Sequence, residues 1–205
     1  MASKKLATYK SYTDEQLMQF VQDKDAYAFE SLYDRYSALM YTYFHRMLWK
    51  DKERARDFTQ ELFSKLFEKS NYFQEGRNFK TWFYSVAHNM CKNEYAKHEV
   101  RVDAHAEIKY STADRAHESS TEAIDKSSFK EKLEEALQTL DEVKRTTFEL
   151  RFYQEMSIQE ISEAMECSEG TVKSRLFYTL KELNGKLKDF EHILKAFLIL
   201  ISFYS

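Results

Sequence analysis

Residues that break helices are scarce in this sequence. Among 205 residues there are three glycines and no proline, against average usages of about 7% and 5%. This scarcity excludes collagen-like, proline-rich and glycine-rich architectures. It also excludes a β-sandwich, which needs a turn roughly every 8–12 residues. The chain is instead 43% hydrophobic and 32% charged, which predicts an all-α protein with material for one or two packed domains.

Cysteines and membrane-directed segments are also scarce. Cys91 and Cys167 have no second cysteine at metal-ligand spacing, which argues against a disulfide framework and a zinc site. No apolar core follows Met1 to Lys5, so we expect no signal peptide. No stretch reaches the ~18 apolar residues of a membrane span. The sequence therefore predicts a soluble, cytoplasmic protein without a metal or other cofactor.

The first half of the chain carries apolar residues at helical spacing. Thr13 to Gln16 form a capping-box pattern. Apolar stripes then run from Phe29 to Met47, from Ala55 to Leu66 and from Phe79 to Met90. Because stripes on consecutive helices can close one core, residues 10–100 are predicted to form an N-terminal helical domain.

The rest of the chain divides into three segments. Residues 101–127 lack periodicity and predict a flexible linker, with a poorly patterned helix packed on a neighbour as the alternative. The stripe resumes at Phe129, so residues 128–189 predict a C-terminal domain. Residues 190–205 form an apolar tail whose side faces also turn apolar beyond Lys195, and a helix that is apolar on all sides requires a cover. We expect this tail to dock on its own chain; a regulatory partner and self-association are the alternatives.

The most specific local pattern is a pair of short capped helices across a tight turn. Ser157 to Glu160 form a second capping box, Glu166 and Cys167 mark a break, and Ser168 can cap the next helix. This spacing predicts a helix-turn-helix. The segment from Thr171 to Lys188 has five basic residues and one acidic residue, a local charge of +4 in a chain of net charge −3.

This charge favours DNA binding, because a recognition helix puts its first side chains into the major groove. The alternative is a basic helix packed in a bundle. A second patch, from Phe79 to Arg101, interleaves aromatic and basic side chains, which suits single-stranded bases. Trp82 and Phe83 are equally consistent with a core.

Motifs for catalysis are missing from the sequence. It has no glycine-rich phosphate loop, no His-x-x-x-His and no nucleophile elbow. The six histidines are scattered, and His88 is an ordinary helical residue by its pattern. We therefore expect a protein that is not an enzyme.

Three segments resemble one known family. Leu140 to Leu183 is similar to the promoter-reading C-terminal domain of bacterial sigma factors, above all in Glu-Gly-Thr-Val-Lys-Ser-Arg at 169–175. Asp57 to Phe63 and Phe79 to Asn89 resemble the N-terminal domain of the same family. Their order matches the small extracytoplasmic-function (ECF) subfamily.

The resemblance implies a dissociable subunit of core RNA polymerase that reads promoter DNA and is bound by an anti-sigma factor. It assigns polymerase docking to one helix, through Asp57, Gln60, Glu61 and Lys65. It assigns the −10 element to Lys80, Trp82, Asn89, Lys92 and Asn93, with Asn89 at a pocket for a flipped base. It assigns the −35 element to Arg151, Thr171, Lys173, Ser174, Arg175 and Phe177.

The chain departs from the family pattern at three positions. Asp141 replaces the usual proline and can cap a helix. Glu166 replaces the glycine common in the helix-turn-helix turn, so any left-handed conformation there carries a cost. Tyr178 stands where a basic residue is common.

The rival hypothesis is a free-standing helix-turn-helix regulator that acts without polymerase. The segments 57–66 and 79–89 favour the sigma factor, because a simple regulator does not need them.

Overall fold

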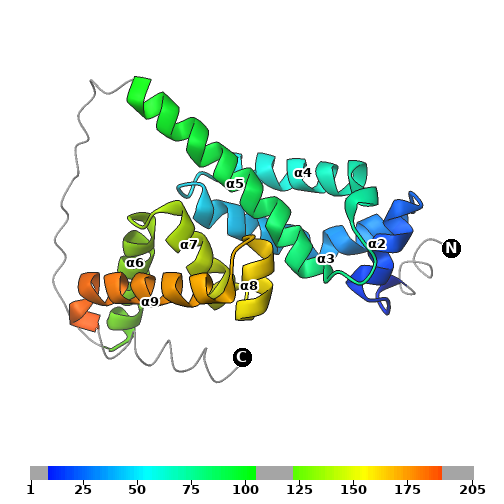
Figure 1. Cartoon of the computed structure of the whole chain (residues 1–205). Coiled ribbons are helices and arrows are strands. Elements are labelled where there is room, and N and C mark those ends of the chain that lie inside the picture. Colours follow the sequence, from blue (N-terminus) through cyan, green and yellow to red (C-terminus); the bar gives the residue numbers. More distant parts are fainter. Residues whose placement is uncertain (1–8, 105–121, 191–205) are drawn as a thin grey trace. The chain divides into compact units, whose positions relative to one another are not determined.

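The computed structural model describes residues 9–104 and 122–190, and these ranges contain helices and no strand (Figure 1). The all-α prediction is confirmed for this part of the chain. The described residues form two compact units, one up to Lys92 together with Gln159–Cys167, and the other from Asn93 to Ile158 together with the chain from Ser168 onward. This division cuts a continuous helix after Lys92 and differs from the domain boundaries predicted from the sequence, which stay a prediction.

Side-chain caps define the helices of the first unit. The Thr13 hydroxyl accepts a hydrogen bond from the Gln16 N–H at 3.2 Å, and the Gln16 side chain accepts one from the Thr13 N–H at 2.9 Å. The predicted capping box is therefore confirmed. Asp25 and Asp51 cap the next two helices. The elements are α2 (Asp14–Gln22), α3 (Ala26–Met47), α4 (Lys52–Glu68), η1 (Ser70–Tyr72) and the first part of α5 (Phe79–Ala104).

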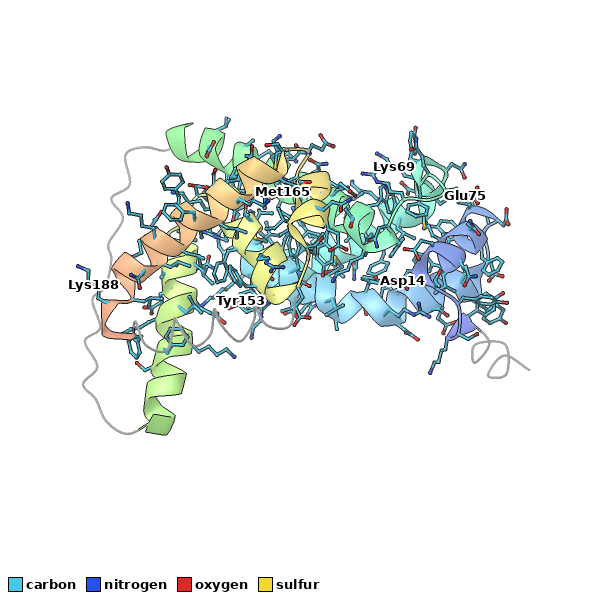
Figure 2. All side chains as sticks on the ribbon, turned by 60° about the horizontal axis from the view of Figure 1, so that its bottom comes forward. Asp14, Lys69, Glu75, Tyr153, Met165 and Lys188 are labelled. Carbon is cyan, nitrogen blue, oxygen red and sulfur yellow. The ribbon has the colours of Figure 1, made fainter. Side chains whose placement is uncertain are left out.

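The core of the first unit is rich in aromatic rings. Phe83 packs edge-on against Tyr36 and Phe63 at centroid distances of 5.6 and 5.4 Å. A polar link fastens α2 to α3, because Asp14, which is labelled in Figure 2, accepts hydrogen bonds from Arg35 and Tyr36. Burial, and then the bond to Asp14, raise the pKa of Tyr36. The phenol thus stays protonated and keeps its donor.

The second unit has a separate apolar core. Its elements are the end of α5, α6 (Glu122–Gln138), α7 (Glu142–Phe148), the π-helical η2 (Glu149–Tyr153), α9 (Glu169–Lys186) and η3 (Lys188–Phe190). Buried residues from α6, α7 and α9 form one cluster, which includes Leu137, Phe148 and Leu183. The apolar stripe predicted from Phe129 onward is therefore confirmed as a core stripe.

Arg145 closes the corner between α6 and α7. It is only 5% exposed, and its guanidinium donates to the carbonyl oxygens of Leu137, Gln138 and Leu140. The last carbonyls of a helix have no partner within the helix, so a buried cation supplies the missing donors. Asp141 caps α7 through the Lys144 N–H at 2.8 Å, as expected for the residue that replaces proline.

The predicted linker is longer than the gap that the structure leaves. α5 continues to Ala104 and α6 begins at Glu122, so the helix ends differ from the predicted linker bounds 101 and 127, and the linker itself stays a prediction. A formed helix adds one hydrogen bond for each residue it fixes, which extends it into weakly patterned sequence. The rest of the predicted linker, 105–121, and the tail after Phe190 lie outside the described residues.

The turn of the helix-turn-helix contains a left-handed residue, Glu166, where the family commonly has glycine. α8 (Ile158–Ala164) is followed by Glu166 with a φ of 50°. The Cys167 N–H donates to the Ser162 carbonyl at 3.0 Å, and Ser168 caps α9 through the Thr171 N–H. Within the described ranges, no helix is long and apolar enough for a membrane span.

We predict that Glu166→Gly stabilises the chain by about 0.4–1 kcal/mol, since removal of Cβ relieves the strain of the left-handed backbone. Thermal unfolding measures the change. The control is Glu163→Gly, in α8, which should destabilise by about 1 kcal/mol because glycine costs that much inside a helix. A loss of stability in Glu166→Gly would contradict the strained turn.

Candidate nucleic-acid interface

The burial of α9 decides which of its side chains face solvent. Val172 and Leu183 are fully buried, and Leu176 is 9% exposed. The opposite side presents Lys173, Ser174 and Phe177, and Phe177 is 62% exposed. A ring as exposed as this in a basic segment is free to touch a partner.

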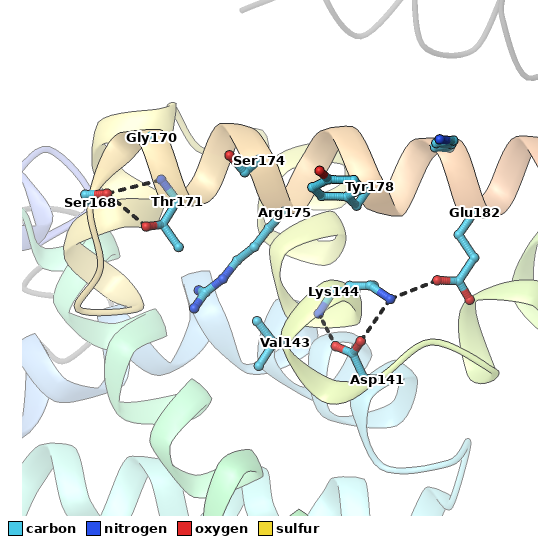
Figure 3. Close-up of a pocket in the computed structure, with 11 residues that line it drawn as sticks. Asp141, Val143, Lys144, Ser168, Gly170, Thr171, Ser174, Arg175, Tyr178 and Glu182 are labelled. Atoms are coloured by element: carbon cyan, nitrogen blue, oxygen red, sulfur yellow. Dashed lines mark hydrogen bonds and ion pairs between the residues drawn. The ribbon is translucent and has the colours of Figure 1, made fainter.

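An open hollow of about 1270 Å³ lies beside this face, within the second unit (Figure 3). The start of α7 and one side of α9 line this hollow, and the lining includes three cationic and two carboxylate side chains. The lining residues are Asp141, Val143, Lys144, Ser168, Gly170, Thr171, Ser174, Arg175, Tyr178, Lys181 and Glu182. The hollow is thus a charged concave surface, of the kind that phosphates contact.

Only some of the predicted −35 residues line this hollow. Thr171, Ser174 and Arg175 line the hollow. Lys173 is exposed outside it, 3.5 Å from Glu169. Arg151 is half-buried, and its guanidinium donates to the Met156 carbonyl at 2.9 Å. The assignment of these residues and of Phe177 as DNA contacts stays a prediction.

Three further side chains of this surface were missing from the predicted set, namely Lys144, Tyr178 and Lys181. Tyr178 is 59% exposed, and its ring meets that of Phe177 at 5.4 Å. Helical spacing from Arg175 points to Tyr178 and Lys181 in the sequence. No sequence signal points to Lys144, because it comes from another helix.

Lys144 stands between two carboxylates in Figure 3. Its ammonium lies 2.9 Å from Glu182 Oε2 and 3.1 Å from Asp141 Oδ2. Hydrogen bonds from Lys144 and then Lys186 lower the pKa of Glu182, and the bond to Glu182 is the main cause that raises the pKa of Lys144. Desolvation tends to raise the pKa of Asp141, but the hydrogen bonds from Lys144 outweigh it, so the pKa of Asp141 is lowered.

The predicted −10 residues lie along α5. Asn89 and Lys92 are exposed and Lys80 is half-buried, and Asn93, in the second unit, is exposed. Trp82 is different, because it is 7% exposed and packs against Phe73 at 5.3 Å. Trp82 therefore has the environment of a core residue, which was the open alternative for this stripe.

A small hollow of about 110 Å³ adjoins Trp82 in the first unit. Lys65 and Lys69 from the end of α4, Tyr72 from η1 and Val86 from α5 are among the residues that line it. Tyr72 is 74% exposed, and the sequence analysis missed it and Lys69. Asn89 follows Val86 by three positions, so the two share one side of α5.

The predicted polymerase-docking residues lie on α4. Asp57, Gln60 and Glu61 are exposed, and Lys65 pairs with Glu61. Positions i, i+3 and i+4 share one face of a helix, so the structure brings these residues together. Gln60 also lines an apolar groove of about 490 Å³ between α3 and α4, whose other lining residues include Phe29, Tyr33, Phe63 and Phe67.

Comparison with known proteins identifies the family. The Sigma-70 region 2 family matches residues 32–101, and the Sigma-70 region 4 family matches residues 130–183. RNA polymerase sigma-H factor of Pseudomonas aeruginosa is 30% identical over 182 residues, which cover 85% of this chain and 94% of that protein. The chain belongs to the RNA polymerase sigma factors. ECF sigma factor SigW of Bacillus subtilis is 27% identical over 82% of this chain and 94% of its own length, and the chain is of the ECF type.

Solved structures of sigma factors share the fold. The sigma factor RpoE from Bartonella quintana, in complex with the anti-sigma factor NepR, matches with a TM-score of 0.61 at 21% identity, over 78% of this chain and 96% of that one. CnrH, in complex with the cytosolic domain of CnrY, matches with a TM-score of 0.61 at 16% identity, over 86% and 97%. These likenesses concern the fold alone.

We predict that Trp82→Ala lowers the free energy of unfolding by about 3–5 kcal/mol, because it leaves a cavity in the aromatic core. Trp82→Phe refills most of this volume and should cost less. Urea unfolding followed by circular dichroism measures both changes. A cost below about 1 kcal/mol for Trp82→Ala would show that the ring contributes little to the core.

Proposed function

We propose that this sigma factor binds core RNA polymerase and directs promoter-specific transcription initiation by reading the −35 and −10 elements. The observation that carries the proposal is α9, which combines a capped start, a buried apolar side and an exposed basic and aromatic side. The proposed role is that of a non-catalytic subunit.

The face of α4 is the proposed site for core polymerase. Asp57, Gln60 and Glu61 supply exposed polar and charged contacts on one side of the helix. The neighbouring groove adds apolar surface, with Tyr33 43% and Phe67 38% exposed. An apolar centre with a polar rim is the usual composition of a protein interface.

α9 and the adjoining hollow are the proposed surface for the duplex −35 element. Lys173 and Arg175 suit phosphates or guanine edges, Ser174 suits either, and Phe177 suits a thymine methyl group. Thr171 already shares a hydrogen bond with Ser168 at 2.9 Å, so it contributes a fixed contact. The −3 charge of the chain is compatible with this role if core polymerase supplies much of the nonspecific affinity for DNA.

α5 is the proposed site for the single-stranded −10 element. Asn89 would bind the edge of a base flipped out of the strand, and this contact offsets a flipping cost of a few kcal/mol. Lys80, Lys92 and Asn93 would follow the backbone. Tyr72, exposed at the small hollow, offers a ring for stacking, and Trp82 would shape the wall of this hollow from within the core.

The proposed domains are residues 10–100 and 128–189. The two family matches, 32–101 and 130–183, support a division of labour between −10 and −35 recognition. An anti-sigma factor is a proposed partner as well, because related sigma factors have been solved in complexes with anti-sigma factors.

We predict that the double variant Asp57→Lys/Glu61→Lys weakens core-polymerase binding at least about tenfold, since a few central contacts dominate an interface. Affinity is measured with purified core enzyme. The control is Glu131→Lys/Glu135→Lys, the same charge change at exposed positions of α6. Unchanged affinity in a folded Asp57/Glu61 variant would contradict docking through α4 and favour a regulator that acts without polymerase.

The two DNA sites should respond differently to mutation. Lys173→Ala should weaken duplex binding and lower the salt slope by about one, through loss of a phosphate contact. Asn89→Ala should spare duplex binding by the free chain but impair promoter melting by holoenzyme, measured by permanganate footprinting. If Asn89→Ala melts promoters like the wild type, the base-flipping role is wrong.

A further inference from the structure

Lys144 lies outside the helix-turn-helix but lines the hollow beside its second helix. It comes from α7, yet it lines the same hollow as Ser174, Arg175 and Tyr178 of α9 (Figure 3). The α7–α9 packing brings it there, and its side chain is 31% exposed. A lysine at this position adds a cation beside the proposed −35 surface.

Two carboxylates hold this lysine. Its ammonium lies 2.9 Å from Glu182 Oε2 and 3.1 Å from Asp141 Oδ2. The second oxygen of Glu182 lies 3.1 Å from the ammonium of Lys186, so one carboxylate pairs with two lysines. Both carboxylates line the hollow.

Exposed ion pairs of this kind are weak. Glu182 and Lys144 are each 31% exposed on their side chains, and Asp141 is 56% exposed. Such exposed pairs contribute little to stability, because solvent screens them. A DNA phosphate, which brings a full charge and displaces its condensed counterions, is therefore able to compete for the ammonium without unfolding the surface.

We propose that Lys144 is a further phosphate contact of the DNA-binding surface, and that Glu182 and Asp141 moderate DNA affinity by competing with the phosphate for its ammonium. The inference rests on the proposed function of α9. It assigns the acidic residues of the hollow a role in restraining the affinity of the free chain for DNA of any sequence, because phosphate contacts carry no sequence information.

The test uses the full chain and a short fluorescein-labelled DNA duplex of arbitrary sequence, with anisotropy measured over a salt series. Glu182→Gln should bind about three- to tenfold more tightly and steepen the salt slope by about one. Asp141→Asn should act in the same direction, because asparagine keeps the cap of α7 and removes the charge. Circular dichroism checks that each variant is folded.

The controls separate this mechanism from net charge. Glu135→Gln removes one negative charge from α6, outside the hollow, and should leave affinity within about twofold of the wild type. In the Lys144→Gln background, Glu182→Gln should give little gain over Lys144→Gln alone. The inference is overturned if Glu182→Gln binds no more tightly than Glu135→Gln, or if its gain persists without Lys144.

Lys173→Ala in the same assay reports on the proposed function itself. Weaker binding by Lys173→Ala with no response to Glu182→Gln overturns the role of the carboxylates alone. A chain whose binding responds to neither variant, or which does not bind the duplex, overturns both.

Discussion

The packing of α9 on α7 and α6 is the contact on which the DNA-binding surface depends. Leu183 and Leu187 enter the same apolar cluster as Phe148 and Leu137, so the rotation of α9 about its axis is fixed. With that rotation fixed, Lys173 and Phe177 face solvent and Arg175 borders the hollow. Arg145 stabilises the corner between α6 and α7, since it donates hydrogen bonds to the carbonyl oxygens there.

In the first unit, packed aromatic rings fix how the helices lie against one another. Phe79 and Phe83 stack on α5 at 5.3 Å, and Tyr36 and Phe63 meet them from α3 and α4. Large rings fill the core at low cost in side-chain entropy, and edge-to-face geometry adds about 0.5–1.5 kcal/mol for a pair. Trp82 belongs to this packing, so the side chains proposed to contact the −10 element are the exposed residues of α5 and of the hollow beside it.

Positive charge is concentrated on α9, although the whole chain has a net negative charge. The chain as a whole is slightly acidic, whereas α9 presents basic side chains beside two carboxylates that already pair with lysines. A local surface of this kind fits the proposed role of a subunit that works together with a larger DNA-binding enzyme. The family to which the chain belongs fits this balance.

The sequence by itself determined the local structure. Thr13, Asp141 and Ser168 are caps in the structure because capping needs only a short polar side chain next to the first turn. Glu166 takes the left-handed conformation in the short turn between α8 and α9 that the spacing of the two helices predicts. The sequence also pointed to the family, because its motifs are contiguous segments that can be recognised without the fold.

Only the tertiary structure decided which side chains share a surface. Periodicity placed Trp82 on an apolar stripe without telling a core ring from an exposed one, and burial between α4, η1 and α5 decided it. Lys144 and Glu182 are 38 residues apart in sequence, so no local pattern announces their ion pair. Contacts of this kind depend on how whole helices pack, because packing sums many weak contacts that no short segment contains.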